Sequence, residues 1–519
     1  MGKELELAKA TAKGATELFA GKVVSRMVGI IGGFLVLRLL SPSDYGLIAI
    51  AMTPAGIFNM FSDWGVSSAM MKYSAEYKGK GKPTEAGEVI IAGYIFRLVA
   101  SVALSMLCYL SANYFALSVF NKPESLSLIK VASLYVVAWA LWESAASTFT
   151  GFERMRRYAG MMVSSDLVKA ILAPLLVFIG YGAVGAIVGN LTAIWVAALF
   201  GFMMASPIAF AHIHLNRVGI RRLRKVVGKM FRYAFPLALV SFIGVGLSQY
   251  YSLLIASWCP ATAVGNYSAA GKIVEIASYV TWPMVVFFPT FSKLNPRGDA
   301  KAFKRVFKYS IKYSSAFVIP TAALLMPLSK PISNLVFGAK YETAWLYLTL
   351  MMIGMILWGF GSYQIGILLT AQGETKLIAK LNAINTISGV LLATILVRMY
   401  GIIGLIIASL VAMWPSYPTA LREIRKLYSL YVPFNDLARI YMATAIATIP
   451  TLAIAFSSMG NLAKLVFGTA VFVILYLAAV LKFGALSKRD LDNLCGIVAP
   501  LPYVNRLAVK VLKILRSFA

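Results

Sequence analysis

The stretch from Ser25 to Ala51 reads SRMVGIIGGFLVLRLLSPSDYGLIAIA, and its pattern decides the fold. One long apolar run reaches Leu40, a Ser-Pro turn interrupts it, and a second apolar run begins a few residues later. A helix needs about 20 mostly apolar residues to cross the hydrocarbon core of a bilayer. The stretch therefore predicts two membrane-spanning helices joined by a short turn.

The same alternation of apolar runs with turn-formers or charges recurs along all 519 residues. The runs predict about fourteen transmembrane helices, each about 20 residues or longer. Their predicted positions are 17–40, 44–66, 86–112, 125–150, 157–180, 183–210, 231–257, 262–290, 306–329, 342–367, 375–397, 400–420, 437–457 and 461–483. The chain is 60% hydrophobic and 13% charged, whereas soluble domains are about 45–50% apolar and about 25% charged. We therefore expect an all-α polytopic membrane protein.

The excess of positive charge has two explanations, a nucleic-acid partner or the positive-inside bias of membrane proteins. The chain has 49 Lys and Arg against 20 Asp and Glu, a formal net charge of +29. Most of these cations fall in segments that the predicted spans place on one side of the membrane. We therefore expect a protein of the cell (cytoplasmic) membrane with both termini in the cytoplasm, in contact with membrane lipids and without a nucleic-acid partner.

A basic segment near the middle of the chain separates six predicted spans from the remaining eight. The two parts echo each other, because Pro42 precedes Gly46 in the first much as Pro260 precedes Gly265 in the second. This echo predicts two similar helical lobes. The predicted organisation is an N-lobe at 1–211, a basic cytoplasmic linker at 212–232, a C-lobe at 233–430, two additional helices at 431–484 and a basic amphipathic tail at 485–519.

Several motifs resemble one family of membrane proteins. The opening stretch, followed by FSDWGVSSAMMKYSAE at 61–76, is similar to the start of polysaccharide-exporting flippases. These belong to the multidrug/oligosaccharidyl-lipid/polysaccharide (MOP) exporter superfamily. VGNYSAAGKIVEI at 264–276 and FFPTFSK at 287–293 resemble the same family in the second lobe.

The resemblance implies two pseudo-symmetric six-helix lobes around a central cavity, with two extra C-terminal helices. It also implies a transporter, not an enzyme. The transporter would flip a lipid-linked (isoprenoid-pyrophosphate) oligosaccharide from the cytoplasmic to the outer leaflet by alternating access. Transport could be coupled to the movement of H+ or Na+. The alternative is a cation-coupled multidrug exporter of the same superfamily. An exporter of cationic drugs would favour acidic cavity residues, whereas the first predicted helix carries Lys22 and Arg26.

A charge inside a membrane span is costly enough to suggest a function. By resemblance to murein-lipid flippases, Arg26 and Lys272 occupy the places of cavity cations. Lys22 lies one helical turn before Arg26, so both can face one phosphate-bearing headgroup; the alternative is that Lys22 reaches the membrane surface. Arg97 lies midway along the third span and either faces the cavity or pairs with a carboxylate such as Glu143.

Four carboxylates are candidates for ion coupling or for charge pairing: Asp63, Glu143, Asp166 and Glu275. Glu275 follows Lys272 by three residues and Asp166 precedes Lys169 by three, so each can neutralise its neighbour. Tyr250, Tyr251, Tyr267 and Trp282 are weaker candidates for stacking on sugar rings. The sequence carries no ATPase motif, HExxH or nucleophile elbow, and we expect no cofactor or metal.

Overall fold

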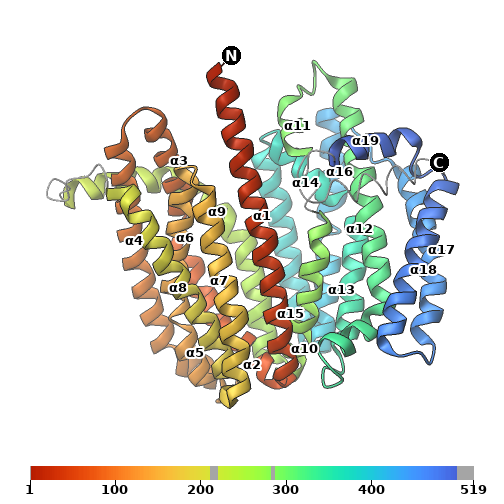
Figure 1. Cartoon of the computed structure of the whole chain (residues 1–519), viewed down its shortest axis with the longest axis horizontal. Coiled ribbons are helices and arrows are strands. Elements are labelled where there is room, and N and C mark those ends of the chain that lie inside the picture. The colour runs from red at the N-terminus through yellow and green to blue at the C-terminus, as the bar shows by residue number, and fades with distance from the viewer. Residues whose placement is uncertain (1, 211–219, 282–286, 499–519) are drawn as a thin grey trace. The chain divides into compact units, whose positions relative to one another are not determined.

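The computed structural model describes residues 2–210, 220–281 and 287–498, and these residues fold into helices without a β-strand (Figure 1). The chain divides into two compact units, Met1–Gly265 and Asn266–Ala519. The part of the predicted tail beyond residue 498, residues 211–219, which include the first part of the predicted linker, and Trp282 lie outside the described residues. The all-helical fold class predicted from the sequence is confirmed.

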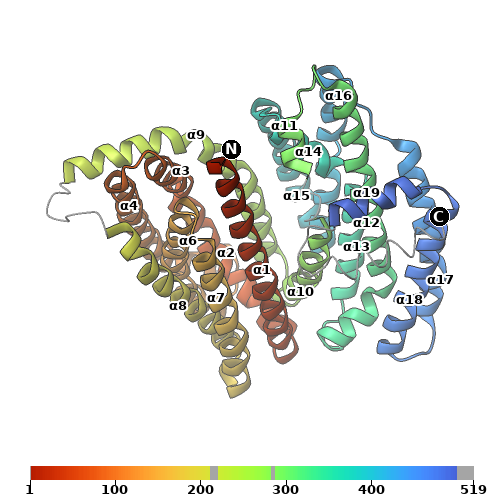
Figure 2. The same ribbon diagram turned by 45° about the horizontal axis from the view of Figure 1, so that its top comes forward.

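Unit 1 contains the helices up to the start of α10. Its elements are α1 (Gly2–Leu39), α2 (Pro42–Asp63), α3 (Val66–Gly79), α4 (Pro83–Leu110), the π-helix η1 (Tyr114–Val119), α5 (Ser125–Ala132), α6 (Tyr135–Gly151), α7 (Met155–Leu176), the π-helix η2 (Val177–Tyr181), α8 (Gly182–Phe210), α9 (Ile220–Trp258) and the first residues of α10 (Ala261–Ser278). α7 packs against both α1 and α8, and α6 packs against α3, α4 and α8 (Figures 1 and 2).

The start of α9 covers residues that the sequence assigned to the linker. Residues 220–232 are helical because their apolar side chains recur with helical spacing and pack on α3 and α4. Val226, Val227 and Met230 belong to this buried cluster, together with Met70 and Ile90. Of the basic side chains between them, Arg224 and Lys225 are exposed, and Lys229 donates a hydrogen bond to the hydroxyl of Tyr77 on α3. The predicted division of the chain at 212–232 therefore falls partly inside a helix that belongs to unit 1.

The two echo motifs meet each other inside unit 1. A β-carbon added to Gly46 would lie 1.8 Å from the carbonyl oxygen of Ala261, and one added to Gly265 would lie 1.8 Å from the carbonyl oxygen of Pro42. Only glycine leaves room for this reciprocal contact, in which the first turns of α2 and α10 touch through their backbones. The Pro-to-Gly spacing that suggested an internal repeat thus lets each glycine contact the backbone of the other motif.

Unit 2 contains the remaining helices. Its elements are the rest of α10, then α11 (Phe287–Lys293), α12 (Ala300–Val336), α13 (Ala344–Trp358), α14 (Ser362–Ala371), α15 (Thr375–Ala412), α16 (Ser416–Tyr428), α17 (Phe434–Phe456), α18 (Asn461–Lys482) and α19 (Lys488–Val498). α12 is central to the unit, because α13, α17 and α18 all pack against it (Figure 2).

A buried ion pair fastens α19 to α12. Lys312 Nζ lies 2.7 Å from Asp490 Oδ2, and the two side chains are only 8% and 4% exposed. Tyr313 donates its hydroxyl proton to Asp490 at 3.0 Å, and Ser487 donates both its amide and its hydroxyl. Burial acts to raise the pKa of Asp490, but the hydrogen bonds from Lys312 and Ser487 outweigh it and lower the pKa below its ordinary value.

The membrane architecture follows from the lengths and compositions of the helices. Among the described residues, eight helices are long and apolar enough to cross a membrane, or up to ten if each of two bent pairs counts as one span. Two of the eight are 54-residue stretches, Met155–Ile208 and Thr375–Tyr428. Positive-φ glycines interrupt both, Gly180 in the first and Gly401 in the second, where the sequence predicts boundaries between spans. The multi-pass architecture is confirmed, while the count of fourteen stays a prediction.

Candidate functional site

Small residues on α1 bring it into backbone contact with α7. A β-carbon added to Gly21 would lie 2.4 Å from the β-carbon of Ala159, and one added to Gly32 would lie 2.3 Å from the α-carbon of Ala170. Such small residues allow two helices to approach closely inside a membrane. Ser25, between the two glycines, is fully buried and donates a hydrogen bond to Asp166.

A pocket of about 340 Å³ with both apolar and charged lining residues opens beside this contact, within unit 1. Its lining residues come from α1, α2, α5, α6, α7 and α8: Ser25, Arg26, Met52, Ala132, Tyr135, Trp139, Trp142, Met162, Ser165, Asp166, Lys169, Ile187, Asn190, Leu191 and Ile194. Arg26 and Lys169 are positive and Asp166 is negative, so the lining carries one net positive charge. The pocket is thus a cationic chamber in a unit whose outer surface is largely apolar.

Three aromatic rings form one wall of the pocket. Tyr135, Trp139 and Trp142 follow each other on α6 with helical spacing. The ring centroids of Tyr135 and Trp139 are 5.6 Å apart and those of Trp139 and Trp142 are 5.0 Å apart, with an angle of 18° between the planes in both pairs. Each ring is half-buried, so each keeps part of its surface open to the pocket.

Asn190 on α8 adds an unsatisfied polar atom to the same pocket. Its side-chain oxygen is buried and accepts no hydrogen bond from the described residues. A buried carbonyl oxygen without a donor costs about 1–3 kcal/mol. Such an atom is an acceptor that a bound water or a ligand with a hydrogen-bond donor can satisfy.

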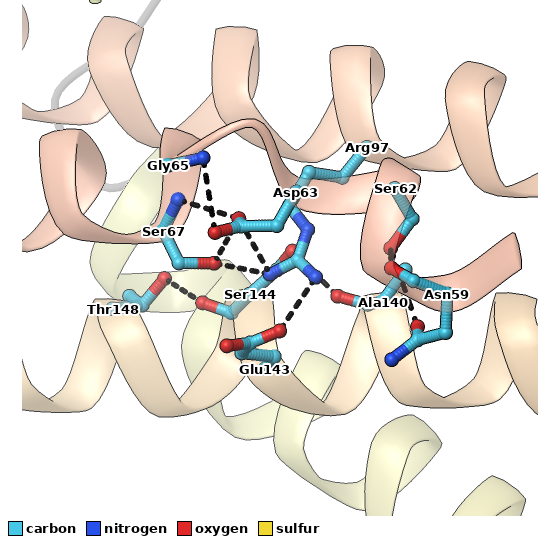
Figure 3. Close-up of polar contacts among 10 residues, drawn as sticks. All are labelled: Asn59, Ser62, Asp63, Gly65, Ser67, Arg97, Ala140, Glu143, Ser144 and Thr148. Carbon is cyan, nitrogen blue, oxygen red and sulfur yellow. Dashed lines mark hydrogen bonds and ion pairs between the residues drawn. The ribbon is translucent and has the colours of Figure 1, made fainter. Parts of the chain in front are cut away.

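A second polar cluster lies around Arg97, which is only 1% exposed (Figure 3). Its guanidinium group lies 2.7 Å from Glu143 and 3.5 Å from Asp63, and it also donates a hydrogen bond to Ser67. The two carboxylates are 34% and 28% exposed. Arg97 on α4 therefore connects α6 with the junction between α2 and α3.

Asp63 shapes that junction. Its carboxylate accepts hydrogen bonds from the amides of Gly65 (3.2 Å) and Ser67 (2.9 Å) and from the Ser67 hydroxyl (2.7 Å), as Figure 3 shows. These bonds satisfy amides at the start of α3 that have no partner within the helix. Trp64 and Gly65 both have positive φ, 47° and 77°, which breaks the chain direction between the helices.

The structure separates the residues that the sequence singled out. Arg26 and Asp166 line the pocket, whereas Lys22, one turn before Arg26, is half-buried and outside the lining. Arg97, Asp63 and Glu143 belong to the ion-paired cluster described above. In unit 2, Lys272 lies 3.1 Å from Glu275, and both side chains are exposed. Tyr250, Tyr251 and Tyr267 do not line the pocket.

Sequence reasoning missed the aromatic wall and Asn190. The segment YVVAWALW at 135–142 carries the signal, because Tyr135, Trp139 and Trp142 fall on one helix face. Aromatic side chains are also common at the ends of membrane spans, so the spacing alone does not distinguish a binding wall from an anchor. Among the described residues, no group of three His, Cys, Asp or Glu side chains is placed to hold a metal ion.

Comparison with known proteins assigns the chain to a family. Residues 35–346 match the family described as polysaccharide biosynthesis protein. The chain belongs to the polysaccharide biosynthesis protein family. This membership confirms the resemblance that the opening motifs suggested.

Relatives of this family member include proteins of bacteria and archaea. The succinoglycan biosynthesis transport protein ExoT of Rhizobium meliloti is 22% identical over 323 residues, which cover 60% of this chain and 60% of the relative. The match thus spans less than two thirds of ExoT. The probable low-salt glycan biosynthesis flippase Agl15 of Haloferax volcanii is 21% identical over 405 residues, 77% of this chain and 80% of the relative.

A solved structure shares the fold of this family member. The lipid II flippase MurJ, in an inward closed conformation, superposes with a TM-score of 0.71 at 19% identity, over 92% of this chain and 99% of MurJ. The similarity extends through both units. The exporter fold predicted from the sequence motifs is therefore confirmed.

Proposed function

We infer that this family member flips a lipid-linked oligosaccharide, with an isoprenoid-pyrophosphate anchor, from the cytoplasmic to the outer leaflet by alternating access. The observation that carries this proposal is the cationic pocket lined by Arg26 and Lys169. A charged headgroup cannot cross hydrocarbon unaided, because an ion without partners in an apolar medium costs tens of kcal/mol. A polar chamber with positive side chains lowers that cost. The names of ExoT and Agl15 and the fold shared with MurJ support the same assignment.

In this proposal, Arg26 and Lys169 bind the pyrophosphate. A guanidinium group donates two parallel hydrogen bonds to phosphate oxygens, whereas an ammonium group acts as a compact point charge. Lys22, one turn away on α1, meets the headgroup as it enters or leaves. Lys272, which pairs with Glu275, remains a candidate contact for a phosphate, and it would then have to exchange that carboxylate for the phosphate. Arg97 acts on the headgroup only indirectly, by fixing α4, α6 and the α2–α3 junction.

Coupling to H+ or Na+ is part of the proposal. Of the four candidate carboxylates, Asp166 is the one that lines the pocket, together with Arg26 and Lys169. Loading Asp166 with H+ or Na+ would raise the positive charge of the pocket and strengthen its hold on an anion. The proposal also includes the orientation with both termini in the cytoplasm, and a transport role instead of catalysis.

The test uses sealed vesicles containing the full-length protein and a fluorescent isoprenyl-pyrophosphate oligosaccharide. An impermeant reducing agent bleaches probe in the outer leaflet, so the amplitude of bleaching reports transbilayer movement. Loss of charge-assisted hydrogen bonds worth about 1.5–3 kcal/mol lowers binding by roughly 10–100-fold. We expect Arg26→Ala to abolish movement of the probe and Arg26→Lys to impair it less.

Arg38→Ala is the matched control, because Arg38 lies on the same helix but does not line the pocket. It should leave the rate unchanged. Transport by Arg26→Ala at the wild-type rate would refute the assignment.

Cation-coupled drug export is the second candidate, favoured by Asp166 beside an aromatic wall. It predicts efflux of a cationic dye such as ethidium that is lost in Asp166→Asn. The net positive charge of the pocket favours the anionic cargo.

A further inference from the structure

We propose that Tyr135, Trp139 and Trp142 form a sugar-binding subsite, which holds the sugar rings nearest to the pyrophosphate while Arg26 and Lys169 hold the phosphates. This inference rests on the proposed function and specifies which part of the cargo each wall of the pocket recognises. It assigns recognition of carbohydrate to α6 and recognition of charge to α1 and α7.

The aromatic wall suits a sugar because it is rigid and still accessible. The three rings support each other along α6, and the ring of Trp142 also meets the edge of Tyr158 at 6.1 Å and 65°. Stacked rings of this kind lose little conformational freedom when a ligand binds. A sugar ring has an apolar face made of C–H groups, and this face can pack on the exposed part of an indole.

Other residues of the lining supply the polar partners that sugar hydroxyls need. The side-chain oxygen of Asn190 is buried without a donor, and Asp166 is a further acceptor in the same lining. A hydroxyl group that donates to Asn190 removes the cost of its unsatisfied oxygen. The lining therefore combines an aromatic stacking surface with hydrogen-bond acceptors, as binding of carbohydrate requires.

Other occupants match the lining less well. A hydrocarbon chain would cover the aromatic rings but would supply neither a hydrogen-bond donor for the Asn190 oxygen nor a negative charge for the cationic part of the lining. A cationic aromatic compound would stack equally well but would meet two positive side chains. A sugar joined to a phosphate satisfies the aromatic wall, the unsatisfied oxygen and the cations together.

The size of the pocket limits how much of the headgroup it holds. Its volume of about 340 Å³ lies near the lower end of the range of about 300–1,000 Å³ for ligand pockets. A whole oligosaccharide does not fit. The subsite therefore binds the reducing end of the glycan, next to the pyrophosphate.

The test compares binding of two probes to the purified full-length protein in detergent. One is isoprenyl pyrophosphate carrying a glucose disaccharide, and the other is the same isoprenyl pyrophosphate without sugar. The wild-type protein should bind the sugar-bearing probe about tenfold more tightly, equal to about 1.4 kcal/mol. Equal binding of the two probes by the wild-type protein would overturn the subsite.

Three variants locate the effect. Trp139→Ala should remove the tenfold preference and leave binding of the sugar-free probe unchanged, while Trp139→Phe, which keeps an aromatic ring, should retain part of it. Asn190→Ala should also reduce the preference. Trp414→Ala, an exposed tryptophan of unit 2, is the matched control and should change neither probe. The subsite would also be overturned if both Trp139 variants kept the full tenfold preference for the sugar-bearing probe. It would likewise be overturned if they lost affinity equally for both probes.

The subsite and the proposed function fail in distinguishable ways. If the wild-type protein discriminates between the probes but moves neither across vesicle membranes, the subsite stands and the flippase assignment falls. If it moves a glycolipid but binds both probes equally, the assignment stands and the subsite falls. Arg26→Ala should lower the affinity of the protein for both probes by the same factor.

Discussion

Replacing Arg97 by methionine should destabilise the protein by about 2–3 kcal/mol, because it leaves two carboxylates without their shared cation. Losing one partner of a buried ion pair costs about 3–5 kcal/mol. Arg97 is 1% exposed, but Glu143 and Asp63 are 34% and 28% exposed. Water can therefore hydrate both carboxylates in part, which places the expected loss below or at the lower end of that range.

A second substitution tests whether electrostatics is the cause. Glu143→Gln removes one of the two stranded charges, so the double variant with Arg97→Met should recover about 1 kcal/mol relative to Arg97→Met alone. Asp63 keeps its hydrogen bonds to the start of α3 in both variants. Methionine also fills much of the volume of the arginine stem, so an empty cavity contributes little.

The assay is thermal unfolding of the full-length protein in detergent at a fixed scan rate, since membrane proteins often unfold irreversibly. Hydrogen exchange at the start of α3 should rise in parallel. Arg38→Met, which removes an exposed arginine from α1, is the control and should have little effect. The reasoning is refuted if Arg97→Met is as stable as the wild-type protein but binds the sugar-free isoprenyl pyrophosphate more weakly. Arg97 would then be a ligand of the cargo.

Two further predictions concern packing and pH. Gly46→Ala should destabilise the protein by about 1–3 kcal/mol, because the new methyl group meets the carbonyl oxygen of Ala261; Gly271→Ala in α10, where nothing lies within 4 Å, should be neutral or stabilising in the same thermal assay. Equal effects of the two substitutions would contradict the backbone contact. Asp490→Asn should leave Lys312 buried without a counter-charge and raise hydrogen exchange throughout α19, whereas Asp492→Asn, an exposed carboxylate of the same helix, should not. Because the pKa of Asp490 is lowered in the folded protein, its contribution is fully present above the unfolded pKa of about 3.9 and is lost as the pH falls through the folded value. Protection of α19 should thus be constant between about pH 5 and 8 and fall only below about pH 4; loss of protection near neutral pH would contradict the assignment.

The sequence predicted the helices well where local chemistry ends them. Pro42, Pro83 and the glycines near 180 and 401 interrupt apolar runs, and helices begin or break at these places. The end of α2 at Asp63 also lies close to the end of the predicted span 44–66, but the apolar pattern does not explain the break there. Its cause is a side chain that caps α3 and an arginine from another helix, neither of which appears in local hydropathy.

The site was only partly predictable for a similar reason. Arg26 could be identified because a cation in an apolar helix is unusual on its own. The two alternatives for Arg97 could not be separated, since its partners Ser67 and Glu143 lie 30 and 46 residues away in the sequence. The aromatic wall depends on which face of α6 meets the pocket, and this is set by the packing of α1, α7 and α8.

The contact between α1 and α7 also limits how the protein can move. Ala159 packs against Gly21, and Ala170 packs against Gly32. The two contacts are the same number of residues apart on each helix, so α1 and α7 run parallel and fit together at two points. Sliding one helix along the other would drive both methyl groups into backbone. In the proposed transport cycle, the backbone segments that carry Arg26 and Lys169 therefore move together. In that proposal, release of the anion comes from rearrangement of the other walls of the pocket or from water entering between the two cations, and not from separation of α1 and α7.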